Sequence, residues 1–170
     1  MEQEGIAPDA ITFVCILKAC ISLGSTALVL GEEIHAKAHK QGLLKTNLML
    51  GNALLNMYAK CGMLENAQSV FDELPARDVI SWNALITGYS QQMHVAQAFF
   101  CFRRMQDEGI LPDAVTALCI LKACASTGSL KLGEEIHVEL CNQGFSVEQG
   151  GVLGTALMDM YAKCGLLGKA

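Results

Sequence analysis

The sequence lacks a long apolar run and the start of an exported or imported chain. Its longest apolar stretches, residues 11–17 and 114–121, stop at lysines and are shorter than the roughly 18 to 20 residues that a membrane span needs. The opening Met-Glu-Gln-Glu-Gly has neither the basic start and apolar stretch of a signal peptide nor the Arg- and Ser-rich character of a transit peptide. We therefore expect no membrane partner, and we expect the chain to be an internal fragment.

Positive charge is also scarce. The chain has 12 basic and 17 acidic residues, a formal net charge of −5. This balance argues against a protein that holds nucleic acid mainly through a large basic surface, so any such binding must use a local groove. A hydrophobic content of 52% with 17% charged residues indicates a chain that folds around a packed core.

Eight cysteines leave disulfides or a metal site open as alternatives. Six of them lie inside apolar segments or in the repeated phrase Ala-Lys-Cys-Gly, namely Cys15, Cys20, Cys119, Cys124, Cys61 and Cys164. A free cysteine packs as a small apolar side chain. We therefore interpret them as buried, reduced thiols of an intracellular protein.

The two ends of the chain are copies of each other. Thr12 returns as Thr116, 104 residues later, inside the shared phrase Pro-Asp-Ala-x-Thr. Gly-Glu-Glu-Ile-His and Met-Tyr-Ala-Lys-Cys-Gly also occur twice, at 31–35 and 133–137 and at 57–62 and 160–165. A shorter period of 31 residues relates Asn52 to Asn83. Periods of this size indicate stacked supersecondary units that cannot bury their apolar faces alone.

Each unit is predicted to be a pair of antiparallel helices. Within 82–89 and 95–102, apolar residues recur at the i, i+3, i+4, i+7 spacing of an amphipathic helix. Glycines and prolines stand where helices are expected to end, at Gly62, Gly109, Gly128, Gly165, Pro75 and Pro112. The predicted fold class is all-α, a right-handed α-α superhelix (solenoid) of helical hairpins.

The phrase Asp-Val-Ile-Ser-Trp-Asn-Ala-Leu-Ile-Thr-Gly-Tyr at 78–89, with the two repeated phrases above, resembles the pentatricopeptide repeats of land plants. The mixture of unit lengths is similar to the subclass that alternates ordinary, long and short repeats. The resemblance divides the chain into the tail of a repeat at 1–9, a long repeat at 10–47, a short one at 48–78, an ordinary one at 79–113, a long one at 114–150 and a truncated short one at 151–170. The long repeats depart from the pattern, with an insertion within 23–30 and an extra residue within 146–151.

A tetratricopeptide array, which is also made of helical hairpins but binds peptides or proteins, is the alternative. Its signature places glycine directly after the leucine of Trp-x-x-Leu. Here Ile86 follows Leu85, and the glycine comes at position 88. The pattern favours the pentatricopeptide family.

The resemblance implies that each repeat reads one base of single-stranded RNA with its fifth and last residues. These residues are Asn52 with Asp78 and Asn83 with Asp113, an Asn/Asp pair that resembles a code for uridine, while Thr155 suggests a purine. An Asn amide can both donate to and accept from a pyrimidine edge, and a carboxylate only accepts. The alternative is that the asparagines are solvated and the aspartates are helix N-caps.

Further contacts follow from the same resemblance. Met49, Ile80 and Val115 are expected to pack on base faces, although the residues alone would be read as core. Lys60 and Lys163 are expected near phosphate, with Gln91 in the ordinary repeat, and solvated lysines are the alternative. The long repeats offer Val14 with Asn47 and Leu118 with Gly150, and because an apolar fifth residue cannot bond a base, we expect them to act as spacers.

No catalytic or cofactor site is expected. His35 and His39 have metal-ligand spacing on one helix, but the copied unit holds His137 and Cys141 without further ligands. Related plant proteins often end in a deaminase-like domain with a His-x-Glu and Cys-x-x-Cys signature, which is not present here. The family implies a non-enzymatic RNA-binding protein of mitochondria or chloroplasts, without a small-molecule substrate, that targets transcripts for C-to-U editing or processing together with editing or processing factors.

Overall fold

The computed structural model describes residues 9–23, 28–145 and 151–165. Within these ranges the regular structure is helical, without strands, which confirms the predicted all-α fold class. The helices are α1 (Ala10–Leu23), α2 (Leu28–Lys40), a short 3₁₀ helix (Leu43–Lys45), α3 (Leu48–Lys60), α4 (Leu64–Glu73), α5 (Val79–Gln91), α6 (Val95–Asp107), α7 (Ala114–Thr127), α8 (Leu130–Asn142) and α9 (Val152–Lys163). The chain divides into two compact units, Met1–Gly88 and Tyr89–Ala170. We call α1, α3, α5, α7 and α9 the first helices, and α2, α4, α6 and α8 the second helices.

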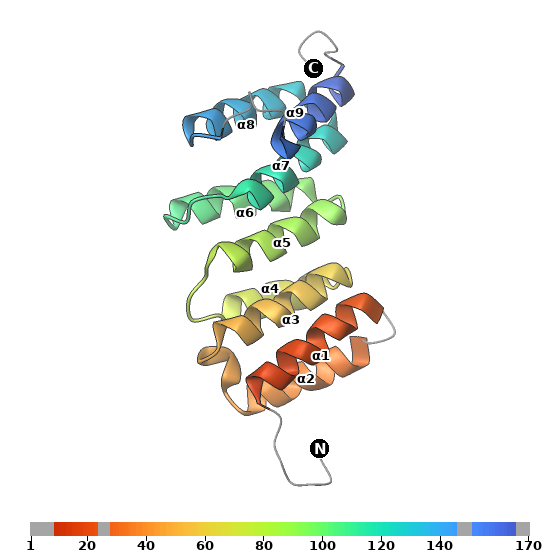
Figure 1. Ribbon diagram of the computed structural model, residues 1–170, viewed down its shortest axis with the longest axis vertical. Coiled ribbons are helices and arrows are strands. Elements are labelled where there is room, and N and C mark those ends of the chain that lie inside the picture. The colour runs from red at the N-terminus through yellow and green to blue at the C-terminus, as the bar shows by residue number, and fades with distance from the viewer. Residues whose placement is uncertain (1–8, 24–27, 146–150, 166–170) are drawn as a thin grey trace. The chain divides into compact units, whose positions relative to one another are not determined.

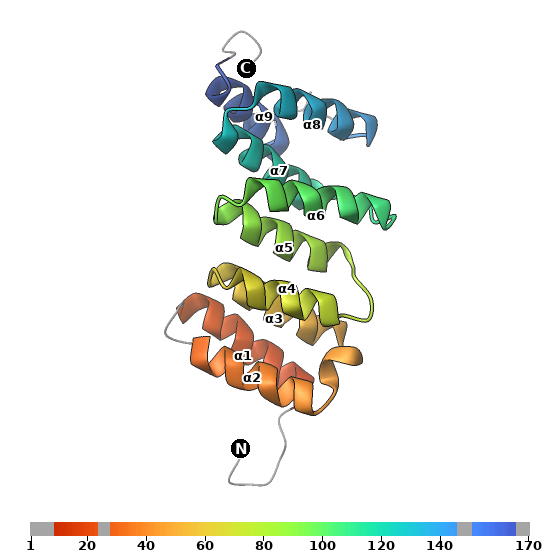
Figure 2. The ribbon, with the colours of Figure 1, turned by 180° about the vertical axis from the view of Figure 1, so that it is seen from behind.

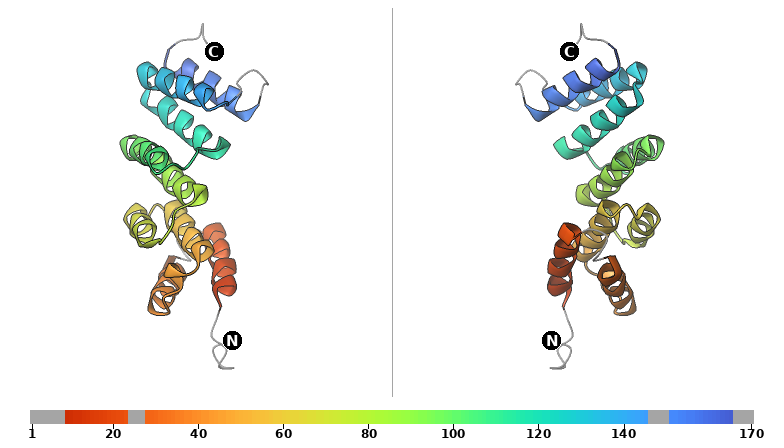
Figure 3. Two further views of the ribbon diagram at one scale, coloured as in Figure 1. Left: turned by 90° about the vertical axis from the view of Figure 1, so that its left-hand side faces the viewer. Right: turned by 90° about the vertical axis from the view of Figure 1, so that its right-hand side faces the viewer.

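In the first unit, α1 pairs with α2, α3 pairs with α4, and α1 also packs alongside α3. Figure 1 looks onto the first helices of this unit, and Figure 2 shows it from the side of the second helices. In the side views of Figure 3, α1 lies on one side of the unit and α2 and α4 lie on the other. The core between the helices includes Leu17, Leu54 and Phe71, which are fully buried.

The start of α5 packs on α4 through an aromatic pair. The rings of Phe71 and Trp82 have centroids 4.6 Å apart and planes inclined by 68°, an edge-to-face arrangement. Both side chains are fully buried. Truncating such a core aromatic typically costs about 3 to 5 kcal/mol. The pair therefore contributes strongly to the packing of α5 on α4.

In the second unit, α7 packs against α6, α8 and α9. Arg103 of α6 forms an ion pair of 2.6 Å with Glu139 of α8, and Gln106 donates a hydrogen bond to the same carboxylate. Ser90, in the last turn of α5, donates to the carbonyl oxygen of Cys119 in α7 at 3.3 Å. Polar contacts therefore join helices of adjacent hairpins above the apolar core.

The two phrases that recur along the chain pack on each other. A Cβ atom added to Gly31 would collide with the end of the Met57 side chain, and one added to Gly133 would collide with Met160. One turn further along the second helix, His35 Nδ1 lies 3.1 Å from the Tyr58 hydroxyl. His137 repeats that contact with Tyr161 at 2.8 Å. Gly-Glu-Glu-Ile-His and Met-Tyr-Ala-Lys-Cys-Gly thus recur together because they form the two sides of one helix–helix contact.

The predicted glycine positions are helix ends in the structure. Gly62, Gly109, Gly128 and Gly165 all have positive φ, between 65° and 85°, a conformation that residues with a Cβ rarely adopt. Each of these glycines closes the last turn of its helix. The glycine-based prediction of these four ends is confirmed.

The cysteines are free thiols, but not all are buried. Cys20 and Cys124 lie in the core, where burial raises the pKa of both thiols, that of Cys124 to about 12. Cys15, by contrast, is exposed, and Cys119 is half-buried. Cys61 and Cys164 are half-buried too. The expectation of buried thiols is therefore wrong for Cys15, which lies on the outward side of α1, and is met only in part by the three half-buried cysteines. No described helix is long and apolar enough to cross a membrane.

Candidate functional site

Each first helix presents a large apolar side chain to solvent in its first turn, at the second position of the predicted repeat. Met49, Ile80 and Val115, the residues expected to contact base faces, are 51% to 59% exposed. The alternative interpretation of these three residues as ordinary core residues is therefore wrong. Ile11 and Val152 lie at the matching positions of α1 and α9 and are also exposed. The sequence analysis missed these two, although the register of the repeats carries the signal.

The first helices are basic within an acidic chain. Their charged residues are four lysines and one aspartate, namely Lys18, Lys60, Lys122, Lys163 and Asp159. Lys163 forms an ion pair of 2.8 Å with Asp159, whereas Lys60 is exposed. Acidic residues outnumber basic ones in α4 and α8. The first helices together therefore carry a net positive charge, although the chain as a whole is negative.

Asn52 is held in a polar network that joins two successive first helices. Its side-chain nitrogen donates to both carboxylate oxygens of Asp78, at 3.1 and 3.3 Å. The Ser81 hydroxyl lies 2.6 Å from Asn52 Oδ1 and 2.9 Å from Asp78 Oδ1, and its single hydrogen donates to one of them at a time. Asn52 is only 8% exposed, so the alternative interpretation of Asn52 as a solvated helix residue is wrong.

Asp78 also starts the next helix. Its carboxylate accepts from the backbone N–H of Ser81 at 2.8 Å, and its own N–H donates to Ser81 Oγ at 3.3 Å, the reciprocal geometry of a capping box. Burial raises the pKa of the Asp78 carboxyl, but the hydrogen bonds from Ser81 and Asn52 outweigh it and hold this pKa below its usual value. The carboxylate is therefore charged and fixed in place.

The remaining last-position residues that the structure describes are caps too. Asp113 accepts from the N–H groups of Val115 and Thr116 at the start of α7. Asn47 accepts from Leu50 at the start of α3 at 3.0 Å, and Asp9 accepts from Thr12 in α1 at 2.8 Å. The capping interpretation of Asp78 and Asp113 is confirmed, and a role in base reading is compatible with it.

The other residues predicted to contact bases are less buried than Asn52. Asn83 is half-buried on α5, and Thr155 is exposed on α9, where its hydroxyl lies 3.4 Å from the carbonyl oxygen of Gly151. Asn83 and Asp113 belong to different units, and their pairing stays a prediction. In the long repeats Val14 is buried and Leu118 is half-buried. Gly150 lies outside the described residues.

The two histidines with metal-ligand spacing have separate partners. His35 contacts Tyr58, and the His39 ring lies 4.0 Å from the Glu73 carboxylate. Burial lowers the pKa of His35, although the nearby Glu73 opposes that shift. In the part of the chain that the structure describes, no three His, Cys, Asp or Glu side chains gather as metal ligands would.

Comparison with family models places repeats in the middle of the chain. A model of the PPR repeat family matches residues 77–126, and a PPR repeat model matches residues 52–79. A chloroplastic pentatricopeptide repeat-containing protein of Arabidopsis thaliana is 41% identical over 97% of this chain and 22% of its own length. A mitochondrial one from the same plant is 38% identical over 97% of this chain and 23% of its own length. The chain thus spans less than a quarter of either relative.

Among solved structures, the chain is similar to the pentatricopeptide repeat protein PPR10 from maize. The match has a TM-score of 0.78 at 22% identity and covers 99% of this chain and 24% of the maize chain. The structure of PPR10 in complex with an 18-nt psaJ RNA element matches with a TM-score of 0.71 and 22% identity, over 99% of this chain and 27% of that one. At this identity the likeness shows the fold, an α-α superhelix.

Proposed function

This chain is a pentatricopeptide repeat protein, and from that membership we propose that it binds single-stranded RNA along the exposed sides of its first helices. The observation that carries the proposal is that each first helix exposes an apolar second-position residue and four of the five also carry a lysine, in a chain that is acidic as a whole. Apolar side chains stack on unpaired bases, and lysines neutralise phosphates. The maize relative of this fold has been solved with RNA bound.

Base reading is proposed for the Asn52/Asp78 and Asn83/Asp113 pairs, with uridine as the preferred base of both. In the first pair, the network fixes the Asn52 amide before any ligand arrives. A reader fixed in advance loses little side-chain entropy on binding. Asp78 accepts only, which suits the N3–H of uracil and repels the lone pair at N3 of cytosine. Thr155 is proposed to read a purine.

Stacking on base faces is proposed for Met49, Ile80 and Val115, and by the same register for Ile11 and Val152. Each of the five first helices carries such a residue. A base can therefore stack on a repeat that lacks a base-reading residue as well as on one that has it.

Phosphate contact is proposed for Lys60 and Lys163. Since Lys163 is paired with Asp159, its contact requires that ion pair to open. An exposed pair of this kind contributes only about 0 to 1 kcal/mol, so a phosphate can displace the aspartate.

The alternation of long, short and ordinary repeats is the finer assignment that we propose within the family, with the boundaries given above. Transcripts of chloroplasts or mitochondria are the proposed targets, because the relatives' names place them in those organelles. C-to-U editing or processing, carried out with separate editing or processing factors, is the proposed setting.

The test is a direct comparison of ligands with the purified chain. Single-stranded RNA is expected to bind, while duplex RNA of the same sequence is expected to bind more weakly because paired bases cannot present their edges to the helices. Equal binding of both RNAs would contradict base-directed binding. Binding of peptides in place of RNA would favour the tetratricopeptide alternative.

A further inference from the structure

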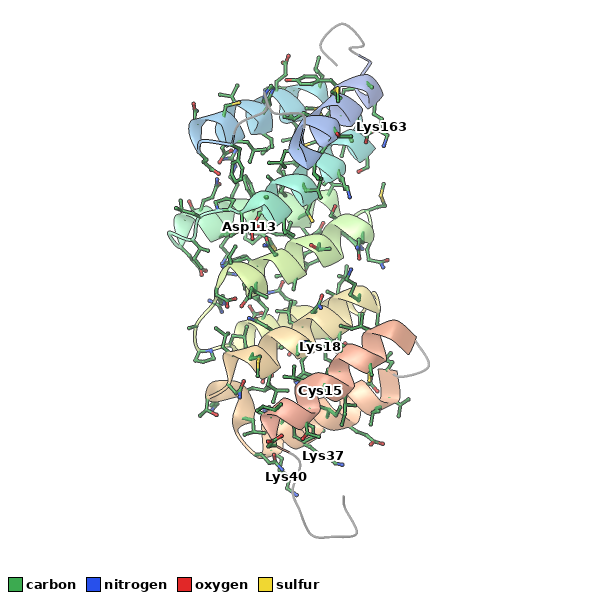
Figure 4. The ribbon with its side chains drawn as sticks, in the orientation of Figure 1. Cys15, Lys18, Lys37, Lys40, Asp113 and Lys163 are labelled. Carbon is green, nitrogen blue, oxygen red and sulfur yellow. The ribbon has the colours of Figure 1, made fainter. Side chains whose placement is uncertain are left out.

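Two lysines outside the contacts assigned above occupy equivalent places in the two long repeats. Lys18 lies on α1 and Lys122 on α7, 104 residues later. Both are exposed, and Figure 4 shows Lys18 on α1 beside Cys15. Among the described residues, neither side chain has a salt-bridge partner. Their charges are therefore available to a ligand.

Their register places both lysines on the side of the helix that carries the exposed apolar residue. Lys18 follows Ile11 by seven residues, and Lys122 follows Val115 by seven. Seven residues are about two turns of an α-helix, so each lysine lies on the same side as the apolar residue. Cys15, one turn after Ile11, is exposed as well, which shows that this side of α1 faces outward over two turns.

The same side of α3 carries its lysine one turn later. Lys60 follows the exposed Met49 by eleven residues, about three turns. In the first unit α1 and α3 pack side by side, so Lys18 and Lys60 belong to neighbouring helices that present apolar and basic groups in the same order. Measured from the exposed apolar residue of its own helix, Lys60 lies about 6 Å further along than Lys18 does.

The fifth residues of the long repeats cannot hold a nucleotide by its edge. Val14 is apolar and buried, and Leu118 is apolar and half-buried. Neither α1 nor α7 contains an acidic residue that could neutralise its lysine. A helix with an exposed cation, an exposed apolar residue and no base reader suits a nucleotide that is bound irrespective of its base.

We propose that Lys18 and Lys122 bind phosphate groups of single-stranded RNA, so that the long repeats hold the backbone of the RNA without reading a base. The long repeats are then active parts of the binding surface and not passive spacers. This inference rests on the proposed function, since it names the part of the RNA that these repeats bind.

The test measures how the affinity of the chain for single-stranded oligouridine depends on salt. Each phosphate contact to a single strand contributes about 0.7 to the slope of log K against log salt concentration. The double variant Lys18→Gln/Lys122→Gln is expected to bind more weakly and to lower the slope by about 1.4. The variant Lys18→Arg/Lys122→Arg is expected to keep the slope. Lys40→Gln/Lys131→Gln, which removes two exposed charges from second helices, is the matched control and is expected to keep it too.

The outcomes separate this inference from the proposed function. If the unchanged chain does not bind the oligonucleotide, the proposed function fails and this inference fails with it. If the unchanged chain binds but Lys18→Gln/Lys122→Gln has the same slope, the proposed function stands and this inference alone is overturned. An equal loss of slope in the Lys40→Gln/Lys131→Gln control also overturns it, because net charge and not position would then explain the effect.

Discussion

The Asn52 side chain donates to both carboxylate oxygens of Asp78, a residue 26 positions further along the chain. The fifth residue of one repeat is thereby bonded to the last residue of the same repeat, which is also the residue that starts the following helix. Two positions that a linear motif treats separately are therefore one hydrogen-bonded unit in the folded protein.

Changing Asn83 to Thr is expected to alter base preference at one position only. The Thr/Asp pair of the family resembles a guanosine code, so Asn83→Thr with Asp113 unchanged should move the preference at that base from uridine toward guanosine. The uridine preference at the Asn52 position should remain. Each mismatch should cost on the order of 1 kcal/mol.

The measurement for Asn83→Thr is a binding competition at fixed salt among single-stranded RNAs that differ only at two adjacent bases. If the unchanged chain and Asn83→Thr rank the four bases identically, Asn83 does not take part in base recognition.

Removing the Asp78 carboxylate is expected to destabilise the first unit. Asp78→Ala deletes a helix cap, which costs about 1 kcal/mol, and leaves the enclosed Asn52 amide without its acceptor. Because the pKa of Asp78 is lowered in the folded chain, its stabilising effect is present above the unfolded-state value near 4 and is lost as the pH falls through the lower folded value. The free energy of unfolding, measured with urea, should therefore be lower for Asp78→Ala than for the unchanged chain at neutral pH. This difference should become smaller in acid.

Asp72→Ala is the control for that experiment. Asp72 is an exposed residue of α4 whose carboxylate accepts a hydrogen bond from the Gln68 amide at 3.0 Å. Its removal should therefore change the free energy of unfolding by less than about 0.5 kcal/mol. A loss as large as that of Asp78→Ala would show that charge, and not the cap and its network, is responsible.

Mild acid is expected to destabilise the chain through His35. Burial lowers the pKa of this histidine in the folded state, so the unfolded state takes up its proton first. The full contribution of neutral His35 is present above the unfolded-state pKa of about 6.5 and is lost as the pH falls from there through the folded value. His35→Gln should flatten the dependence of the midpoint of unfolding on pH across this window, whereas His94→Gln, at an exposed site, should leave the slope as it is. A slope unchanged in His35→Gln would assign the pH dependence to other groups.

Two helix glycines should respond differently to alanine. A Cβ at Gly88 would lie 2.9 Å from the Ala59 Cβ and 3.3 Å from its Cα, whereas at Gly31 it would meet the mobile end of Met57. Alanine gains about 1 kcal/mol in helix propensity, but crowding against backbone costs about 1 to 3 kcal/mol. We expect Gly88→Ala to lower the free energy of unfolding by about 1 kcal/mol and Gly31→Ala to leave it nearly unchanged. Thermal unfolding of the two variants decides the matter, and a gain in stability for Gly88→Ala would contradict the close packing of α3 and α5.

The sequence was sufficient for the all-α fold class and for the helix ends at the four glycines with positive φ, because such glycines and capping aspartates act within a few residues of the chain. It did not predict the burial of Asn52. That burial depends on Ser81, 29 residues away, and on the register in which two first helices pack. Nor did it predict that Cys15 is exposed, because apolar residues extend around α1 and Lys18 is its only charged residue.

The fact that last-position residues cap the following helix restricts how this array could be redesigned. Helix starts favour Asp, Asn, Ser and Thr, and replacing these by apolar residues costs about 0.5 to 2 kcal/mol at each start. Substitutions at the last position of a repeat are therefore limited to a few short polar side chains, whatever RNA sequence is to be bound. Under the proposed code, diversity must come mainly from the fifth residue, which caps no helix itself.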